Sequence, residues 1–299
     1  MSFGPDDLPD LSGTVAVVTG GNSGIGFHTV KALAAHGARV VLACRNVTAA
    51  EEAASRITGD TRVERLDLAS QASVSDFAAR WDGPLDLLVN NAGLMRPPHY
   101  RETTDGHELM FGTNHLGHFA LTGRLLPALL SAPAPRVVTI ASVAHHSGND
   151  GVLAGNPPEG YRPEEYYGNS KLANLLFARE LQRRATEAGS TLVSTAAHPG
   201  VSATNLVGSP DGMGASWVVR HVVGPYVLPL VFQSAAAGAN PTLYAATVAE
   251  PGSYTGPQRF GEWRGPIGPA RLSRYAADGE LGRKLWTLSE EKTGVTFTL

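Results

Sequence analysis

One glycine-rich stretch near the start of the chain most constrains the fold. Residues 15–18 are apolar and mostly β-branched, which predicts a short buried strand, and residues 20–26 (GGNSGIG) are too rich in glycine to extend it. Apolar residues then recur at helical spacing until His36-Gly37, a typical helix end. A strand, a glycine turn and a helix in this order form a cradle for a pyrophosphate, because the backbone approaches the anion closely and the helix N-terminus offers free N–H groups.

The glycine spacing, Gly20-x-x-x-Gly24-x-Gly26, differs from the general dinucleotide fingerprint G-x-G-x-x-G. By itself it also fits an ordinary tight turn between a strand and a helix. The flanking elements favour nucleotide binding. We therefore expect a bound dinucleotide to contact the following residues of the turn: Gly20, Asn22, Ser23, Gly24, Ile25 and Gly26.

Apolar runs alternate with helical segments along residues 15–200. Strands are predicted at 15–18, 39–43, 63–66, 85–89, 136–142 and 191–197, and helices at about 48–57, 71–81, 107–130 and 165–188. The strands are continuous apolar runs, as in sheets that are buried on both faces. The fold class is therefore α/β, a Rossmann-type, doubly wound parallel sheet with helices on both faces. No repeat or long linker divides the 299 residues, which predicts a single domain over 1–299.

Polar residues or glycines follow the predicted strands at the edge where such sheets bind ligands. Six strand ends would thereby face one crevice, which an architecture without a ligand would not require. The residues at these ends are Thr19, Cys44-Arg45, Asp67, Asn91, Ser142 and Pro199-Gly200.

Composition excludes several classes of function. A net charge of −3 gives no electrostatic basis for nucleic acid or an anionic membrane as the main partner. The longest apolar run, 222–232, contains one glycine and two prolines and is too short to span a bilayer. The single cysteine, Cys44, excludes an internal disulfide and a cysteine-based metal cluster. With no signal peptide in the polar first ten residues, we expect a soluble, cytoplasmic protein without a membrane span.

Tyr167 and Lys171 lie four residues apart in a predicted helix and so share one face of it. An unperturbed phenol has a pKa of about 10 and is a poor base at neutral pH. A nearby ammonium lowers that pKa and makes the tyrosine a usable general acid–base. Exposed helices often contain such a pair, so the spacing alone also fits a surface tyrosine beside a solvated lysine.

Two further polar residues support a catalytic interpretation of the pair. Ser142 ends the fifth predicted strand, where its hydroxyl would either bond a substrate oxygen or cap the local backbone. Asn114 lies inside a predicted helix, where asparagine is mildly unfavourable. It is either a surface residue or an internal group that bridges Lys171 and water.

Taken together, these motifs resemble the short-chain dehydrogenase/reductase family in identity and order, closely over residues 12–200 and less closely beyond. They are Thr19-Gly20…Gly24-Ile25-Gly26, Asn90-Asn91-Ala92-Gly93, Asn114, Ser142, Tyr167…Lys171 and Pro199-Gly200. The segments 42–46 (LACRN), 115–119 (HLGHF), 170–174 (SKLAN) and 252–265 are similar to the retinol dehydrogenase-like branch, which includes protochlorophyllide reductase-like enzymes.

The resemblance implies a Ser–Tyr–Lys triad assisted by asparagine. Ser142 would orient the substrate carbonyl or hydroxyl, and Tyr167 would transfer the proton. Lys171 would lower the pKa of the tyrosine and hold the nicotinamide ribose, while Asn114 would join a proton relay to solvent. Hydride passes directly between the nicotinamide and the substrate carbon, so the reaction needs no metal.

The resemblance also implies cofactor contacts beyond the glycine turn. Residues over the nicotinamide would be Pro199, Gly200 and Thr204; Asp67 and Leu68 would contact the adenine, and Asn91, Ala92 and Gly93 would form the floor of the cleft.

Residues 43–46 (ACRN) indicate which nicotinamide cofactor binds. An NAD enzyme usually places an acid about 20 residues after the glycine turn to bond the ribose 2′-hydroxyl, and this segment has none. Arg45, next to Asn46, suits a 2′-phosphate because arginine forms paired, charge-assisted hydrogen bonds. NADP(H) is therefore favoured over NAD(H), unless Arg45 is merely an exposed loop residue.

Apolar residues predict a lipophilic alcohol, aldehyde or ketone as substrate, although several of them would equally fit core positions. They occur in the loop after Gly93 (Leu94, Met95, Pro97, Pro98, His99 and Tyr100) and in a substrate loop or lid at about 201–232 (Leu206, Met213, Trp217, Val222, Val223, Tyr226 and Phe232). His145 and His146 follow Ser142, but without a G-x-S-x-G motif we interpret them as loop residues.

Three functions remain open at this point. The first is an NADP(H)-dependent oxidoreductase for a carbonyl/alcohol pair. The second is a regulator that binds NADP(H) without chemistry, which the presence of Ser142, Tyr167 and Lys171 disfavours. The third is a reductase of a carbon–carbon double bond. The sequence also leaves open a homo-oligomer that pairs through the helix with the Tyr–Lys motif.

Overall fold

The computed structural model describes residues 3–200 and 233–299. The predicted lid at about 201–232, which includes the expected cofactor contact Thr204, lies outside the described residues. Among the described helices, none combines the length and the apolar character that a bilayer crossing needs.

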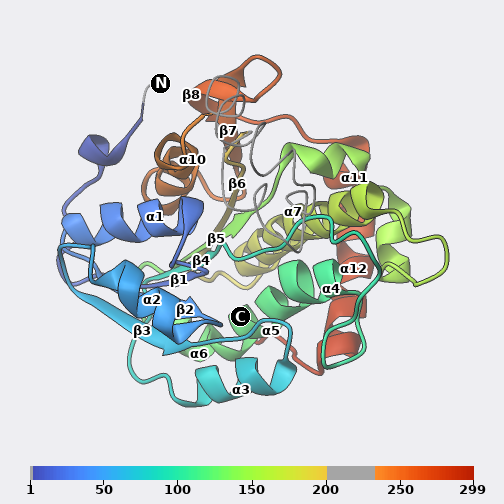
Figure 1. Ribbon diagram of the computed structural model, residues 1–299, viewed down its shortest axis with the longest axis horizontal. Helices are drawn as coiled ribbons and strands as arrows, with labels where there is room; N and C mark the ends of the chain where they lie inside the picture. Colours follow the sequence, from blue (N-terminus) through green and yellow to red (C-terminus); the bar gives the residue numbers. More distant parts are fainter. Residues whose placement is uncertain (1–2, 201–232) are drawn as a thin grey trace.

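A single eight-stranded sheet forms the centre of the molecule, in the order β3-β2-β1-β4-β5-β6-β7-β8 (Figure 1). Neighbouring strands from β3 to β7 are parallel, and β8 is antiparallel to β7. The predicted parallel sheet of Rossmann type is thus confirmed. Its strands are β1 (Val15–Thr19), β2 (Arg39–Cys44), β3 (Thr61–Arg65), β4 (Leu87–Asn90), β5 (Arg136–Ile140), β6 (Val193–Ala197), β7 (Tyr254–Arg259) and β8 (Arg264–Pro269).

Helices cover both faces of the sheet, with α1 and α10 on one side and α5, α7 and α12 on the other (Figure 1). Successive residues of β1 face opposite layers: Val18 packs in a cluster with Val30 and Leu243, whereas Val17 packs in a cluster with Phe119. The central strands β1, β2, β4 and β5 are mostly apolar because both of their faces are buried, whereas the edge strand β3 (TRVER) is polar and only partly buried. The helices are α1 (Gly24–Ala35), α2 (Val47–Ala54), α3 (Gln71–Ala79), α7 (Pro163–Glu187), α10 (Ala235–Thr247), α11 (Arg274–Ala277) and α12 (Gly279–Thr293).

The helix predicted over 107–130 is interrupted. It comprises α4 (Leu109–Phe111), a π-helical turn η2 (Gly112–Leu116), α5 (Gly117–Arg124) and α6 (Leu126–Leu130). Pro127 in the first turn of α6 has no N–H to continue the hydrogen-bond ladder of α5. Short 3₁₀ helices occur at η1 (Pro5–Asp7), η3 (Val143–Ser147) and η4 (Asp150–Ala154).

The layer beneath α7 and α12 contains an aromatic cluster centred on Trp286. Its ring centroid lies 4.6 Å from that of Phe297, 5.1 Å from that of Phe119 and 5.8 Å from that of Phe177. Only 2% of Trp286 is exposed, so this side chain fastens α12 to the rest of the core.

We expect Trp286→Ala to lower the free energy of unfolding by about 3–5 kcal/mol, because it removes a buried indole and leaves a cavity. Phe260→Ala is the control, since 67% of Phe260 is exposed and its loss should cost less than about 0.5 kcal/mol. Urea titration measures both changes. Equal effects of the two substitutions would contradict the assignment of Trp286 to the core.

Candidate active site

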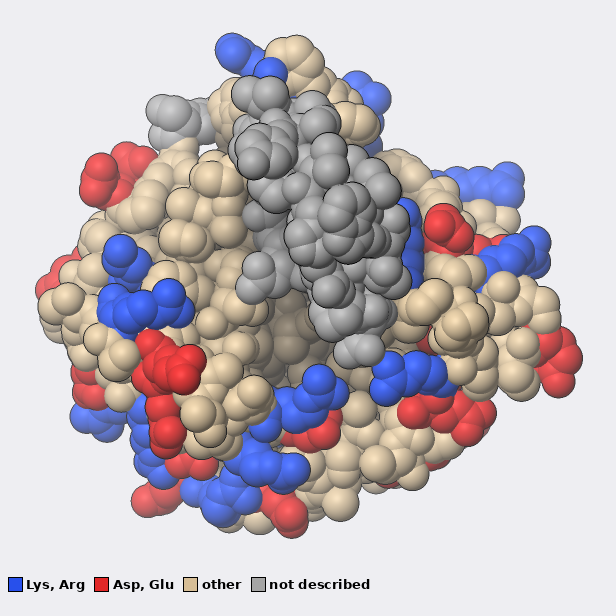
Figure 2. Space-filling view, viewed as in Figure 1, with Lys and Arg blue, Asp and Glu red and all other residues tan. Residues whose placement is uncertain are grey.

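The carboxyl ends of the parallel strands meet at one edge of the sheet, where the predicted site residues gather. Seen from this side, the surface has a hollow over the region in which Figure 1 labels β1, β4 and β5, and lysine and arginine side chains lie along its lower margin (Figure 2). Such an edge is where open α/β sheets bind their ligands.

The turn between β1 and α1 has the close-packed backbone that the sequence predicts. Gly20 and Gly24 adopt φ angles of 64° and 55°, which disfavour residues with a β-carbon. A β-carbon on Gly26 would lie only 2.4 Å from the Gly20 carbonyl oxygen. Ser23 caps α1 in an extended conformation and makes no side-chain cap bond, so the helix N-terminus keeps N–H groups for an anion.

Cys44 lies beneath this turn. Burial raises the pKa of its thiol, although hydrogen bonds from the backbone of Asn22, Gly21 and Gly20 partly offset that effect. The thiol therefore supports the turn as a small, neutral core group.

Asn91 and Ala92 brace the same turn from the end of β4. The Asn91 side-chain amide donates to the Thr19 carbonyl at 2.7 Å, and the backbone N–H groups of Asn91 and Ala92 both donate to the Thr19 hydroxyl oxygen at 2.9 Å. Because both residues hold the backbone at the start of the turn, they fix the distance between β1 and β4 at the sheet edge.

His118 joins the glycine turn to Asn114. Its Nδ1 lies 2.9 Å from the Asn114 carbonyl oxygen, and its Nε2 lies 2.9 Å from the Thr19 hydroxyl. A carbonyl only accepts, so Nδ1 carries the proton and Nε2 accepts from Thr19. Burial lowers the pKa of His118 to about 4, which keeps the ring neutral.

Asn114 is an internal residue of the π-helical turn, which excludes the surface interpretation. Its Oδ1 accepts the Leu94 N–H at 2.9 Å, and its Nδ2 donates to the Leu94 carbonyl at 3.1 Å and to the Ser170 hydroxyl at 3.0 Å. A β-carbon on Gly93 would lie 3.1 Å from Asn114 Oδ1 and 3.5 Å from Lys171 Nζ. Gly93 therefore allows the loop after β4 to lie against both groups.

Tyr167 and Lys171 lie on the face of α7 that packs against the sheet edge, not in solvent. They are 8% and 5% exposed. Lys171 Nζ donates to the Ile140 carbonyl at 3.1 Å and lies 5.9 Å from the centre of the Tyr167 ring. Burial lowers the pKa of Lys171 to about 8.

The expected effect of Lys171 on the phenol is not the one observed. Burial raises the pKa of Tyr167 above its usual value, and the opposing influences are a hydrogen bond with Ser142 and the charge of Arg96. The prediction of a pKa lowered by Lys171 is therefore wrong for the protein alone, because the ammonium bonds Ile140 and burial is the largest effect.

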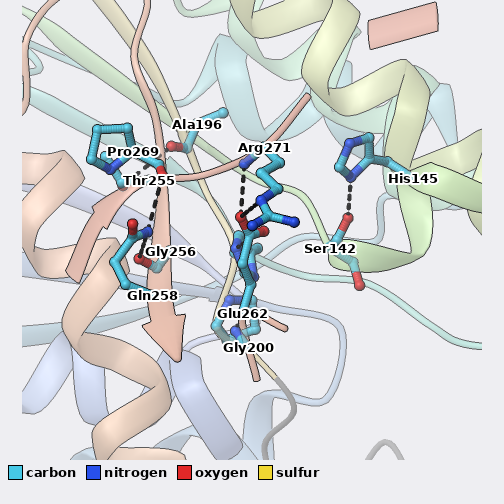
Figure 3. Close-up of polar contacts among 12 residues, drawn as sticks. Ser142, His145, Ala196, Gly200, Thr255, Gly256, Gln258, Glu262, Pro269 and Arg271 are labelled. Carbon is cyan, nitrogen blue, oxygen red and sulfur yellow. Dashed lines mark hydrogen bonds and ion pairs between the residues drawn. The ribbon is translucent and has the colours of Figure 1, made fainter. Parts of the chain in front are cut away.

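Ser142 is the N-cap of the 3₁₀ turn η3: its hydroxyl oxygen accepts the Ala144 N–H at 3.1 Å, so it caps the local backbone as one of the two expectations had it. Its own backbone is held by His145 (Figure 3). The His145 Nδ1–H donates to the Ser142 carbonyl at 2.7 Å, and its Nε2 accepts the Ser273 N–H at 3.2 Å. Burial lowers the pKa of His145 to about 4. The interpretation of His145 as a plain loop residue is thus wrong, whereas His146 is exposed as expected.

The end of β6 is joined to the β7–β8 hairpin through a buried histidine and a glutamate (Figure 3). The N–H of Gly200 donates to His198 Nδ1 at 3.1 Å, and His198 Nε2 lies 3.4 Å from a Glu262 carboxylate oxygen. The other carboxylate oxygen accepts the Arg271 N–H at 2.9 Å. These contacts fix the backbone of Pro199 and Gly200 at the sheet edge.

The residues predicted to bind the adenosine half lie at the ends of β2 and β3. Arg45 is exposed and forms no ion pair with another described residue. Asn46 accepts the Ala49 N–H and thereby caps α2, and Asp67 accepts the Ala69 N–H at 3.0 Å. Leu68 is buried.

Sequence reasoning missed four residues near the site: Arg96, His118, His145 and Tyr254. A signal existed for His118, which follows Asn114 by one helical turn. Arg96 and Tyr254 have no such local signal, because tertiary packing alone brings them to Tyr167.

Three buried histidines make stability dependent on pH. Burial lowers the pKa of His115 to about 3 and those of His118 and His145 to about 4, against about 6.5 in an unfolded chain. As the pH falls, these histidines take up protons in the unfolded chain at a higher pH than in the folded protein. The free energy of unfolding therefore has its full value above pH 6.5 and decreases as the pH falls towards 4. We expect each of these histidines to lower the free energy of unfolding by about 2 kcal/mol at pH 5. Urea midpoints between pH 7.5 and 5 measure this loss.

The variant His115→Gln removes one of these titrating groups and keeps an amide for the Ser289 hydroxyl that His115 contacts. Its stability should therefore fall less steeply with pH than that of the wild type. If the stability of His115→Gln fell with pH as steeply as that of the wild type, His115 would not be one of the titrating groups.

Comparisons with known proteins agree with this geometry. The family model for short chain dehydrogenases matches residues 14–211. Retinol dehydrogenase 13 of Mus musculus is 38% identical (96% of this chain, 86% of the relative), and polyprenol dehydrogenase of Mus musculus is 39% identical (98% and 87%).

Solved structures agree as well. An uncharacterised protein from Mycobacterium paratuberculosis has a TM-score of 0.84 at 40% identity, with both chains fully covered. The RhlG/NADP active-site complex of Pseudomonas aeruginosa has a TM-score of 0.60 at 26% identity, over 82% of this chain and 94% of that one. The chain therefore belongs to the short-chain dehydrogenase/reductase family and is a retinol dehydrogenase-like oxidoreductase.

Proposed function

We propose that the protein is an NADP(H)-dependent oxidoreductase that transfers hydride between the nicotinamide and a lipophilic carbonyl/alcohol substrate, with Tyr167 as general acid–base. One observation carries the proposal: Tyr167, Lys171, Ser142 and Asn114 gather at the sheet edge that also holds the glycine turn. The intact triad and the oxidoreductase relatives disfavour a catalytically silent regulator.

The residues at this edge fit a dinucleotide. The glycine turn leaves no room for β-carbons and ends at a helix N-terminus without a side-chain cap, which suits a pyrophosphate. Gly93 and Lys171 lie close together at the same edge, because a β-carbon on Gly93 would be 3.5 Å from Lys171 Nζ, and this lysine would hold the nicotinamide ribose. When bound there, the cofactor supplies or takes the hydride.

The chain's own residues handle the proton. In the reductive direction the Tyr167 hydroxyl donates a proton to the substrate oxygen, which the Ser142 hydroxyl also bonds and orients. Burial raises the pKa of the phenol and keeps the proton on its oxygen, whereas the hydrogen bond with Ser142 and the charge of Arg96 oppose this shift and favour release of the proton. The same two groups favour the phenolate that remains, and Asn114 holds the Leu94 backbone.

Apolar side chains around the phenol support a lipophilic substrate. Leu94, Met95, Met110 and Tyr161 pack in one cluster with Tyr167. Relatives carry the names retinol dehydrogenase and polyprenol dehydrogenase, which denote long apolar alcohols. A cytoplasmic location is part of the proposal, supported by a free, buried Cys44 thiol that suits a reducing compartment.

We expect Tyr167→Phe to lower kcat by about 10²–10⁴-fold for ketone reduction with NADPH, because it removes the proton donor. Tyr166→Phe is the matched control, since the neighbouring hydroxyl bonds the Pro157 carbonyl away from the pair and its loss should spare turnover. Initial rates with carbonyl and enone substrates test the proposal and separate ketone from carbon–carbon reduction. Undiminished turnover by Tyr167→Phe would refute the role of this phenol.

Arg45 is proposed to bond the 2′-phosphate of NADP(H). Kinetics with both cofactors should favour NADPH, and Arg45→Asp should reverse the charge at that position and reduce the ratio of kcat/KM values by at least tenfold. Arg80→Asp, an exposed arginine paired with Glu64, is a control for the change in net charge. Equal use of NADH by the wild type would remove the basis for this assignment.

A further inference from the structure

We propose that Arg96 is a substrate-binding residue that pairs with a second oxygen acceptor of the substrate, a carboxylate next to the carbonyl that reacts at Tyr167. The preferred substrates would then be lipophilic 2-oxo acids and the corresponding 2-hydroxy acids. The inference rests on the proposed function, because it assigns the substrate class of the same site.

The backbone of Arg96 is strained. Its φ angle is 52°, in the left-handed region that is unfavourable for a residue with a β-carbon. Pro97 follows it, and a residue before proline normally adopts an extended conformation. Such strain persists only where surrounding contacts impose it, and it is concentrated at functional sites.

Two hydrogen bonds impose this conformation. The Arg96 N–H donates to Met110 Sδ at 3.3 Å, and the Tyr161 hydroxyl donates to the Pro97 carbonyl at 2.7 Å. The loop is therefore held on both sides of the strained residue. Its conformation directs the arginine side chain to the phenol, with the guanidinium carbon 5.8 Å from the centre of the Tyr167 ring.

The guanidinium of Arg96 lacks a hydrogen-bond acceptor for its buried Nε. No ion pair among the described residues includes Arg96. By contrast, Arg184 lies over Trp286 and also pairs with Glu180. A buried donor without an acceptor is unfavourable, so a bound ligand that supplies the acceptor removes that penalty.

The surroundings determine which acceptor fits best. Leu94, Met95 and Met110 make this wall apolar, and a charge-assisted hydrogen bond in such an environment is stronger than in water. The planar fork of an arginine matches the two oxygens of a carboxylate. A carboxylate held by Arg96 would fix the adjacent carbonyl against Tyr167 and Ser142, which provides orientation as well as affinity.

A binding experiment tests this without turnover. Calorimetry on the NADPH-loaded protein compares mandelate with 1-phenylethanol, two alcohols that differ by a carboxylate in place of a methyl group. We expect mandelate to bind at least tenfold more tightly to the wild type, and this ratio to fall at least tenfold in Arg96→Met. Arg96→Lys should restore part of the ratio, and Arg162→Met, which alters an exposed arginine paired with Glu165, should keep the wild-type ratio.

Turnover of phenylglyoxylate and acetophenone with NADPH then separates the two levels of the proposal. If neither ketone is reduced but the mandelate preference depends on Arg96, the proposed function fails and the binding role of Arg96 stands. If acetophenone is reduced and Arg96→Met lowers binding and turnover of both compounds equally, the carboxylate role of Arg96 is refuted and the oxidoreductase stands. The carboxylate role of Arg96 is also refuted if the wild-type protein binds mandelate no more tightly than 1-phenylethanol.

Discussion

The site depends on one buried contact, the hydrogen bond from the Lys171 ammonium to the Ile140 carbonyl. A buried ammonium without acceptors would be costly, so this bond determines how α7 lies across the end of β5. Asn174, one turn later, donates to the same carbonyl at 3.0 Å and reinforces the alignment. The burial of the lysine has a chemical consequence too, because it lowers the pKa of the ammonium to about 8.

Two neutral histidines hold further backbone groups around the site. His118 links Asn114 to Thr19, and His145 links the Ser142 carbonyl to Ser273. Each ring donates through one nitrogen and accepts through the other, which only the neutral form can do. Apolar packing alone would not fix the orientation of these backbone groups, whereas a bridging ring does. The position of Ser142 therefore depends on residues far from it in the sequence.

The part of the fold that sequence predicts well is the part with local signals. The β1–α1 turn is specified by Gly20, Gly24 and Gly26, and the strands β1, β2, β4 and β5 by apolar runs. The strands β7 and β8 were not predicted because their sequences, YTGPQR and RGPIGP, are rich in glycine and proline. In the site, too, features with a local sequence signal were predicted and features that depend on tertiary packing were not. The spacing of Tyr167 and Lys171 was visible, but the burial that raises the pKa of the phenol depends on tertiary packing.

The antiparallel hairpin has a consequence for how the sheet ends. Without β8, the row of N–H and C=O groups along β7 would be open to pairing with another chain. β8 covers that row, and on the outer side of β8 Pro269 lacks the N–H group that a further strand would need. The glycine and proline content that hides this hairpin from sequence analysis thus protects the molecule against aggregation at its sheet edge.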